Sequence, residues 1–273
     1  MVKLPIIHSP WADAPADFAI GLRPIAPAAW LEGGEADPAA RKDPLFAAHR
    51  DLVWAELDGS RPGQEEALAL VRSLGAAAEA GSWPPLYAAA RAVADDLCLM
   101  EKRDGAWTLT ALSLSAGTFF SAAEVIGKPL ATLHAPVPGF GERFLARVAR
   151  IFDALAADAI LERRNWTVMA GDDLFAPDGA AVRARIADIA PGRAGEALHV
   201  RVERQTIRRL PATGGVLFTI RVWRHPLAAL DDDPARRAAF AQAWRGATPA
   251  FRSYKRLAAY DALVEGYLRA KGE

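Results

Sequence analysis

The sequence has one cysteine among its 273 residues, Cys98, and it lacks long apolar segments. A single cysteine excludes an internal disulfide and any cysteine-ligated iron–sulfur cluster or zinc site within this chain. No apolar stretch approaches the roughly 20 residues of a membrane-spanning helix, and the amino terminus lacks the apolar length of a secretory signal. We therefore expect a cytoplasmic protein that has no membrane partner.

The sequence also lacks an excess of charge of either sign, because 33 basic residues balance 33 acidic ones. A balanced chain has no global field that would attract nucleic acid, so nucleic acid is not an expected partner. Neither common phosphate-binding loop follows a strand, and the G-x-S-x-G and H-E-x-x-H motifs are absent. These absences argue against nucleotide binding and against serine or zinc hydrolase chemistry. With one cysteine, the electrons for any redox reaction must come from a separate carrier.

Hydrophobic periodicity predicts helices in the first third of the chain. The first forty residues are rich in Pro, Ala and Gly and predict an extended arm packed on a surface. A helix is expected from Asp43, a good N-cap followed by Pro44, because apolar residues recur with helical spacing as far as Leu57. Two more helices are expected over about 64–74 and 84–94.

The pattern then changes to strands. Two β-prone runs flank Asp104-Gly105, a strong hairpin signal. Ser121 and Glu124 match a capping box, and the segment 141–160 has the spacing of one amphipathic helix. Three further strands are expected over 165–170, 198–207 and 215–223, and from Pro234 the chain reads as helical almost to its end.

This order of elements predicts an α+β fold with an antiparallel sheet of about five strands, a helical middle segment, and flanking amino-terminal and carboxyl-terminal helices. We expect an arm with helices over 1–94, a core over 95–225 and carboxyl-terminal helices over 226–273, packed as one compact unit.

The run "HVRVERQTIRRLP" puts many charges into a predicted strand. Strand alternation sends Arg204 and Arg208 to one face and Glu203 to the other, so neither face is cleanly apolar. Either the strand lies at an exposed edge, or one face lines a cavity that holds something polar. The charges are either a solvated face or buried and paired, because removing one partner of a buried ion pair costs about 3–5 kcal/mol.

His134 stands out among the five histidines because of its context, "LHAPVPGF". Pro136 and Pro138 fix two φ angles and bias the residues before them towards extended geometry. An imidazole on such a stiff segment suits an axial iron ligand. The alternative is a loop histidine that only forms hydrogen bonds.

A polar and aromatic cluster, Arg163, Asn165 and Trp166, lies in "ERRNWTVM". Arginine holds carboxylates in forked geometry, and tryptophan supplies a flat apolar wall. The alternative is an exposed helix end, where an arginine side chain interacts favourably with the helix dipole. Cys98 lies in the apolar run "LCLM" and is expected to pack in the core.

Four segments in the same order resemble the haem-dependent oxidative N-demethylase family: "DDLCLMEKRDGAWTLTA", "IGKPLATLHAPVPGF", "ERRNWTVM" and "VERQTIRRLPATGGVLFTIRVW". The resemblance covers about residues 18–260, and its His-x-Pro-Val-Pro and Glu-Arg-Gln-x-Ile-Arg-Arg-Leu-Pro runs are specific. It implies a PAS-like fold in which a five-stranded antiparallel sheet faces a helical middle segment with haem between them. The implied reaction is O2-dependent removal of a methyl group from a small secondary amine, with electrons from flavin and iron–sulfur partner subunits.

The resemblance implies one site residue directly, His134, and the roles expected for the other site residues are inferred from their charge. His134 lies in the matching motif and is the expected axial ligand of a haem b iron. Glu203 is the expected catalytic residue and would orient the substrate ammonium, while Arg204 or Arg163 would pair with a propionate. The residues expected to bind the cofactor are His134, Arg163, Asn165, Trp166, Arg204 and Arg208.

The sequence departs from the family in "LSLSAGTFFSAAEVIGKP". This segment lacks the Pro and Trp that family members tend to have there, and Val125 stands where a Lys is usual. Two other functions stay open: a non-catalytic PAS-like haem or small-ligand sensor, and a scaffold subunit without haem. No signalling output domain is evident, which favours the enzyme.

Overall fold

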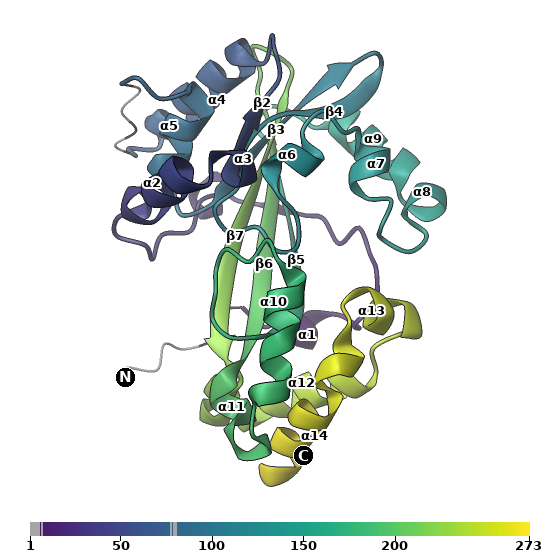
Figure 1. Cartoon of the computed structure of the whole chain (residues 1–273). Coiled ribbons are helices and arrows are strands. Elements are labelled where there is room, and N and C mark those ends of the chain that lie inside the picture. The colour runs from purple at the N-terminus through teal and green to yellow at the C-terminus, as the bar shows by residue number, and fades with distance from the viewer. Residues whose placement is uncertain (1–5, 7, 77, 79–80) are drawn as a thin grey trace. The chain divides into compact units, whose positions relative to one another are not determined.

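The structure is a computed structural model that describes residues 6, 8–76, 78 and 81–273 (Figure 1). The chain divides into two compact units. Unit 1 comprises residues 1–19, 164–204 and 222–273, and unit 2 comprises residues 20–163 and 205–221. The division therefore uses boundaries other than those of the three expected segments, which stay a prediction.

A seven-stranded sheet has the order β1-β5-β6-β7-β3-β4-β2. Its strands are β1 (Arg23–Ile25), β2 (Trp54–Glu56), β3 (Asp96–Arg103), β4 (Ala106–Ser113), β5 (Ile160–Ala170), β6 (Leu198–Arg209) and β7 (Val216–Pro226). β3 pairs antiparallel with both β4 and β7, so Cys98 lies opposite Leu112 on one side and Phe218 on the other. The α+β class is confirmed.

The expectation of five strands is wrong, because β1 and β2 add one short strand at each edge of the sheet. Each has three residues, too few for a period of two to be recognised in the sequence. β2 also lies inside the segment expected to be helical from Asp43 to Leu57. The helix there is α2 (Pro38–Ala48), capped by Asp37, whose side chain accepts a hydrogen bond from the Ala40 N–H at 3.1 Å.

Most other elements appear where the sequence predicts them. Asp104 and Gly105 have φ angles of 51° and 81°, and they join β3 to β4 in the expected hairpin. The capping box of Ser121 and Glu124 is present at α6. The helices of unit 2 are α2, α3 (Arg50–Val53), α4 (Arg61–Ser73), α5 (Pro85–Arg91), α6 (Ala122–Val125), α7 (Leu130–Leu133), α8 (Phe140–Arg143), α9 (Leu145–Ala154) and the 3-10 turn η1 (Pro27–Ala29).

Helices cover both faces of the sheet in unit 2. Figure 1 shows α2, α4 and α5 on one side of the strands and α6, α7, α8 and α9 on the other. Leu99 of β3 faces α4, because a Cβ added at Gly63 would lie 2.9 Å from its side chain. Its neighbours Cys98 and Met100 belong instead to a core cluster with Phe152 of α9. Alternation along β3 thus separates two apolar layers, and Cys98 packs in the core as expected.

The amino-terminal arm packs on the sheet through Trp30. This side chain is 0% exposed, and its Nε1–H donates to the Thr206 Oγ1 at 2.9 Å. The Thr206 hydroxyl also lies 2.8 Å from that of Thr219 on β7. The guanidinium of Arg208 lies 4.6 Å from the centre of the indole ring. Trp30 therefore joins the arm to the middle of the sheet.

Replacing Trp30 with Phe should lower the free energy of unfolding by about 2 kcal/mol, because the variant loses one buried hydrogen bond and part of a buried ring. Urea unfolding at neutral pH measures the effect. Trp83→Phe, at a half-buried indole, is the matched control and should cost less than about 1 kcal/mol. Equal losses in the two variants would contradict the anchoring role of Trp30.

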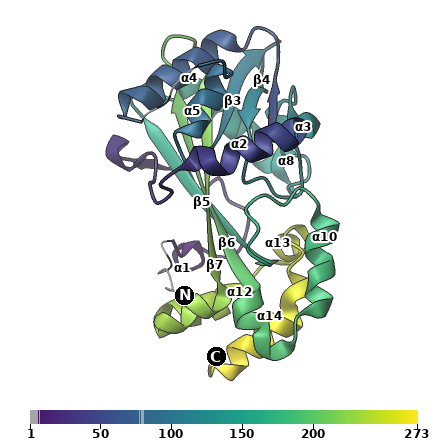
Figure 2. The same cartoon turned by 60° about the vertical axis from the view of Figure 1, so that its left-hand side comes forward.

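Unit 1 has its own core. Figure 2 shows α12 and α14 beside the ends of β6 and β7. Phe240 and Trp244 of α12 pack there with Val200 and Val202 of β6 and with Trp166 of β5. The elements of this unit are α1 (Pro10–Asp13), α10 (Gly179–Ala184), η2 (Arg185–Asp188), η3 (Pro191–Arg193), α11 (Ala194–Ala197), η4 (Leu227–Asp232), α12 (Pro234–Arg245), α13 (Pro249–Tyr254), η5 (Leu257–Tyr260) and α14 (Asp261–Ala270). In the described part of the chain, no helix has both the length and the apolar character needed to cross a membrane.

Candidate functional site

The charged strand β6 lies between β5 and β7, so the alternative of an exposed edge strand is wrong. Its charges are also largely buried: Arg201 is 2% exposed and Arg204 is 1% exposed. The Arg201 guanidinium donates to the Leu174 carbonyl at 3.2 Å, and its Nε lies 3.8 Å from the Glu203 Oε1. Arg201 is therefore held inside the protein by polar partners.

Alternation along β6 divides the predicted site residues between the two faces of the sheet. Thr206 and Arg208 both contact Trp30, so their side chains point to the face that the arm covers. Ile207 between them packs with the residues of α9 on the opposite face. Arg204 has the same parity as Arg208, whereas Glu203 has the parity of Ile207. The structure thus does not bring Arg208 to the side of the sheet that carries α7 and His134.

The imidazole of His134 has a defined orientation. His134 follows α7, and its Nδ1 lies 3.0 Å from the carbonyl oxygen of Leu130. A carbonyl only accepts hydrogen bonds, so Nδ1 must carry the proton, and in the neutral ring Nε2 then carries the lone pair. Burial lowers the pKa of His134, and the nearby charge of Arg163 lowers it further, which favours the neutral ring.

Arg163 shares a face of the sheet with His134. Leu161, two residues earlier on β5, packs in the same cluster as Leu133 of α7. Because side chains two apart on a strand share a face, Arg163 points to that side as well. The charge of Arg163 lowers the pKa of His134, which agrees with this placement. The structure therefore places two of the predicted cofactor-binding residues on the same side of the sheet in unit 2.

Trp166 lies in a different environment. It is 4% exposed, and its ring centre lies 6.0 Å from that of Trp11 and 5.5 Å from that of Phe240. It is thus part of the hydrophobic core of unit 1. Aromatic rings of the core surround it, and its role as a flat wall of a binding site stays a prediction.

Asn165 and Glu203 form a polar cluster in unit 1. The Asn165 Nδ2 donates to the Glu203 Oε2 at 3.0 Å, and the Lys255 ammonium donates to the Asn165 Oδ1 at 3.1 Å. A donor at one end and an acceptor at the other fix the orientation of the amide. The Glu203 side chain is 26% exposed. Lys255 was not predicted, because nothing in the sequence around it indicates a partner 90 residues away.

Iron in haem needs few ligands from the protein, since the porphyrin supplies four nitrogens. Among the residues that the structure describes, no three His, Cys, Asp or Glu side chains are grouped to hold a metal ion by themselves. Burial raises the pKa of the Cys98 thiol, which disfavours a thiolate ligand there. His134 therefore stays the predicted iron ligand.

The sequence profile of the family described as haem-dependent oxidative N-demethylase, alpha subunit-like, matches residues 69–264. The chain belongs to this family. The matched region begins within α4, ends within α14 and includes every predicted site residue. The resemblance read from the sequence is confirmed. The family name indicates dependence on haem, and the words alpha subunit imply an assembly of several subunits.

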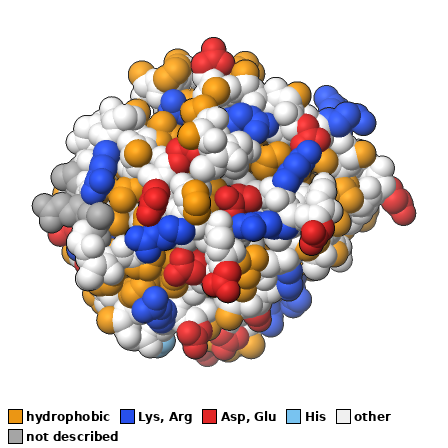
Figure 3. Space-filling model, turned by 90° about the horizontal axis from the view of Figure 1, so that it is seen from above, with side chains coloured by type: hydrophobic (Ala, Val, Ile, Leu, Met, Phe, Trp, Pro, Cys, Tyr) orange, Lys and Arg blue, Asp and Glu red, His pale blue; other side chains and the backbone are white. Residues whose placement is uncertain are grey.

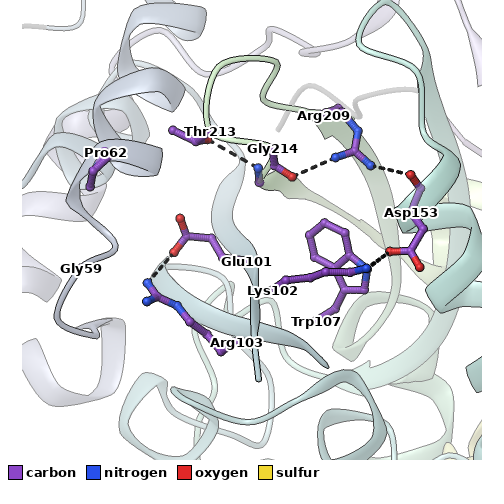
Figure 4. A pocket seen from close by; sticks show the side chains of 11 residues that line it. Gly59, Pro62, Glu101, Lys102, Arg103, Trp107, Asp153, Arg209, Thr213 and Gly214 are labelled. Atoms are coloured by element: carbon purple, nitrogen blue, oxygen red, sulfur yellow. Dashed lines mark hydrogen bonds and ion pairs between the residues drawn. The ribbon is translucent and has the colours of Figure 1, made fainter. Parts of the chain in front are cut away.

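In this member of the N-demethylase family, unit 2 also has an open pocket of about 630 Å³ (Figure 4). None of the predicted site residues lines it. Its polar groups bind one another: the Trp107 Nε1–H donates to the Asp153 Oδ1 at 2.8 Å, and the Lys102 ammonium lies 2.7 Å from the same carboxylate. The lining residues are Gly59, Pro62, Glu101, Lys102, Arg103, Trp107, Asp153, Arg209, Thr213, Gly214 and Gly215. This set offers no imidazole, thiol or thioether to an iron.

The surface seen from the top of Figure 1 carries charges of both signs. Figure 3 shows Lys and Arg side chains mixed with Asp and Glu over this face, with no area of one sign. Such a mixture differs from the basic stripe that binds nucleic acid.

Proposed function

We propose that this chain binds haem b through His134 and, with it, removes a methyl group oxidatively from a small secondary amine. The observation that carries the proposal is the hydrogen bond from the His134 Nδ1–H to the Leu130 carbonyl, which reserves Nε2 for a metal. Haem b is the form expected, because the single cysteine and the absence of C-x-x-C-H leave no site for thioether attachment. The PAS-like fold implied by the family resemblance is part of the same proposal.

Two of the predicted cofactor-binding residues on one face of the sheet support this proposal. His134 would hold the iron, and Arg163 on the same side would pair with a propionate carboxylate. Arg208 lies on the face covered by Trp30 and has no part in this arrangement. Its Nε and Nη1 are buried and have no hydrogen-bond partner among the described residues, and its guanidinium lies 4.6 Å from the centre of the Trp30 ring. When bound, haem supplies the activation of dioxygen and the oxidation of the methyl group.

Glu203 would bind the substrate amine. A small secondary amine is a cation at neutral pH, and a partly exposed carboxylate can accept hydrogen bonds from its N–H groups. Asn165 holds one carboxylate oxygen in place, and Lys255 fixes Asn165 in turn. The chain would receive electrons from a separate flavin and iron–sulfur subunit, because its one cysteine cannot hold a cluster.

The direct test is to supply haem to the purified protein, record the absorption spectrum, and measure formaldehyde released from dimethylamine with an artificial reductant. We expect a Soret band, and we expect formaldehyde in stoichiometric amount with the dimethylamine that is consumed. No Soret band at saturating haem would overturn the proposal. Haem binding without turnover by the complete assembly would support the sensor instead.

Replacing Glu203 with Gln should raise the KM for the amine by about 10–100-fold, because a charge-assisted hydrogen bond to the ammonium becomes a neutral one. The Soret band should stay unchanged, since the side chain keeps its shape. Glu196→Gln is the matched control, because its carboxylate is 67% exposed on α11. An unchanged KM in Glu203→Gln would remove Glu203 from substrate binding.

A further inference from the structure

We propose that Phe140 is the positioning residue for His134, and that its ring together with the Leu130 carbonyl presents Nε2 in one fixed orientation. The inference rests on the proposed function for its purpose, since a fixed imidazole matters for an axial ligand. It assigns a role to a residue that the sequence did not single out.

The two restraints act on different motions of the imidazole. The ring of Phe140 lies parallel to that of His134, with centroids 4.2 Å apart and an angle of 11° between the planes. Rotation of the imidazole about its bond to Cβ would drive an edge of the ring into the Phe140 face. The Leu130 carbonyl then selects which nitrogen faces the helix, because only an N–H can lie 3.0 Å from it favourably. The stacking on Phe140 fixes the plane of the imidazole ring, and the hydrogen bond to Leu130 fixes which ring nitrogen faces the helix.

The intervening loop explains why Phe140 reaches His134. The Val137 N–H donates to the His134 carbonyl at 2.9 Å, and the Phe140 N–H donates to the Val137 carbonyl at 3.1 Å. Gly139 between these two turns has a φ of 69°, in the left-handed region that favours glycine. A Cβ at this position would lie 3.0 Å from the Arg143 Cδ. Two tight turns therefore return the chain so that Phe140, 6% exposed, lies against the imidazole.

The effect of such orientation on metal affinity can be measured. Losing the groups that orient a metal-binding histidine typically costs about 10–100-fold in metal affinity. Such variants keep the bond between the metal and the histidine nitrogen. The loss of affinity therefore measures the effect of positioning apart from that of ligation. Phe144 provides a matched comparison, because it lies one helical turn beyond Phe140 and its ring centre is 6.3 Å from that of Phe140.

The experiment compares Phe140→Leu with Phe144→Leu by two readouts. The first uses the protein without haem: nitrogen-15 NMR of labelled histidine, assigned with His134→Gln, reports which ring nitrogen carries the proton. The wild type should show the Nδ1–H tautomer, and Phe140→Leu should show a mixture. The second readout is haem titration followed at the Soret band, where Phe140→Leu should bind about 10–100-fold more weakly and Phe144→Leu like the wild type.

Retention of both the single tautomer and the wild-type haem affinity in Phe140→Leu would overturn the inference, as would an Nε2–H tautomer in the wild type. If the wild type binds no haem but Phe140→Leu still changes the tautomer, the proposed function fails and the positioning role stands. Gly139→Ala covers the case in which Phe140→Leu does not fold. It keeps the Phe140 ring, strains an exposed turn, and should shift the tautomer in the same direction.

Discussion

His134→Ala is expected to lose the Soret band of the haem-supplied protein and to release formaldehyde at background level. The variant removes the only protein ligand proposed for the iron, so the loss of haem affinity should exceed the roughly 100-fold limit for residues that only orient a ligand. Haem titration and formaldehyde assays on the same preparations measure the two effects. The change removes a half-buried side chain next to Phe140, so circular dichroism should accompany both.

His49→Ala is the control for this variant, because His49 is exposed at the end of α2. It should leave both the spectrum and the activity unchanged. A Soret band of unaltered position and ligation in His134→Ala would show that another residue binds the iron. The family membership would then stand, and the assignment of the ligand would not.

The sequence predicted the long elements of the fold well because each has a local signal. Asp104-Gly105 fixes a hairpin, and the apolar spacing within 141–160 indicates the helix α9, although α9 spans only Leu145–Ala154 and β5 already begins at Ile160. β1 and β2 were missed because three-residue edge strands form through pairing with a neighbour, Arg23 with Glu162 in one case and Trp54 with Ser113 in the other. The residues of such a short strand do not by themselves predict this pairing.

The candidate site was predicted only in part, for a reason that strand geometry explains. Charges on one strand look like one cluster in a sequence, but alternation puts Arg208 beside Trp30 and Glu203 beside Asn165. The sequence showed which residues of the strand share a face. It did not show which of the two faces lies on the side of His134. Lys255 and Phe140 contribute through tertiary contacts, for which the sequence had no local signal.

Acid should destabilise this protein through His225 on β7. The side chain is 3% exposed, and its Nε2 has no hydrogen-bond partner within the described residues. Burial lowers the pKa of His225 to about 4, and the charges of His8, Arg236 and His199 act in the same direction. In the unfolded chain the imidazole titrates near its ordinary value of about 6.5.

The sign of the effect follows from proton binding. Between these two pKa values the unfolded chain binds the proton and the folded chain does not, so stability present above about pH 6.5 is lost as the pH falls through about 4. The full loss is about 3 kcal/mol, a large part of the stability of a typical domain. Urea unfolding at pH 7.5 and at pH values towards 4 measures it.

Carboxylates also titrate in this range, so the variant His225→Phe isolates the histidine. Phe fills a similar volume and cannot bind a proton, and the variant should lose less stability than the wild type between neutral and acid pH, by about 3 kcal/mol at most. His49→Gln should keep the wild-type dependence, because His49 is exposed. If the wild type and His225→Phe lose stability equally on acidification, His225 is not held neutral by burial, and the positive groups around it do not repel its charged form.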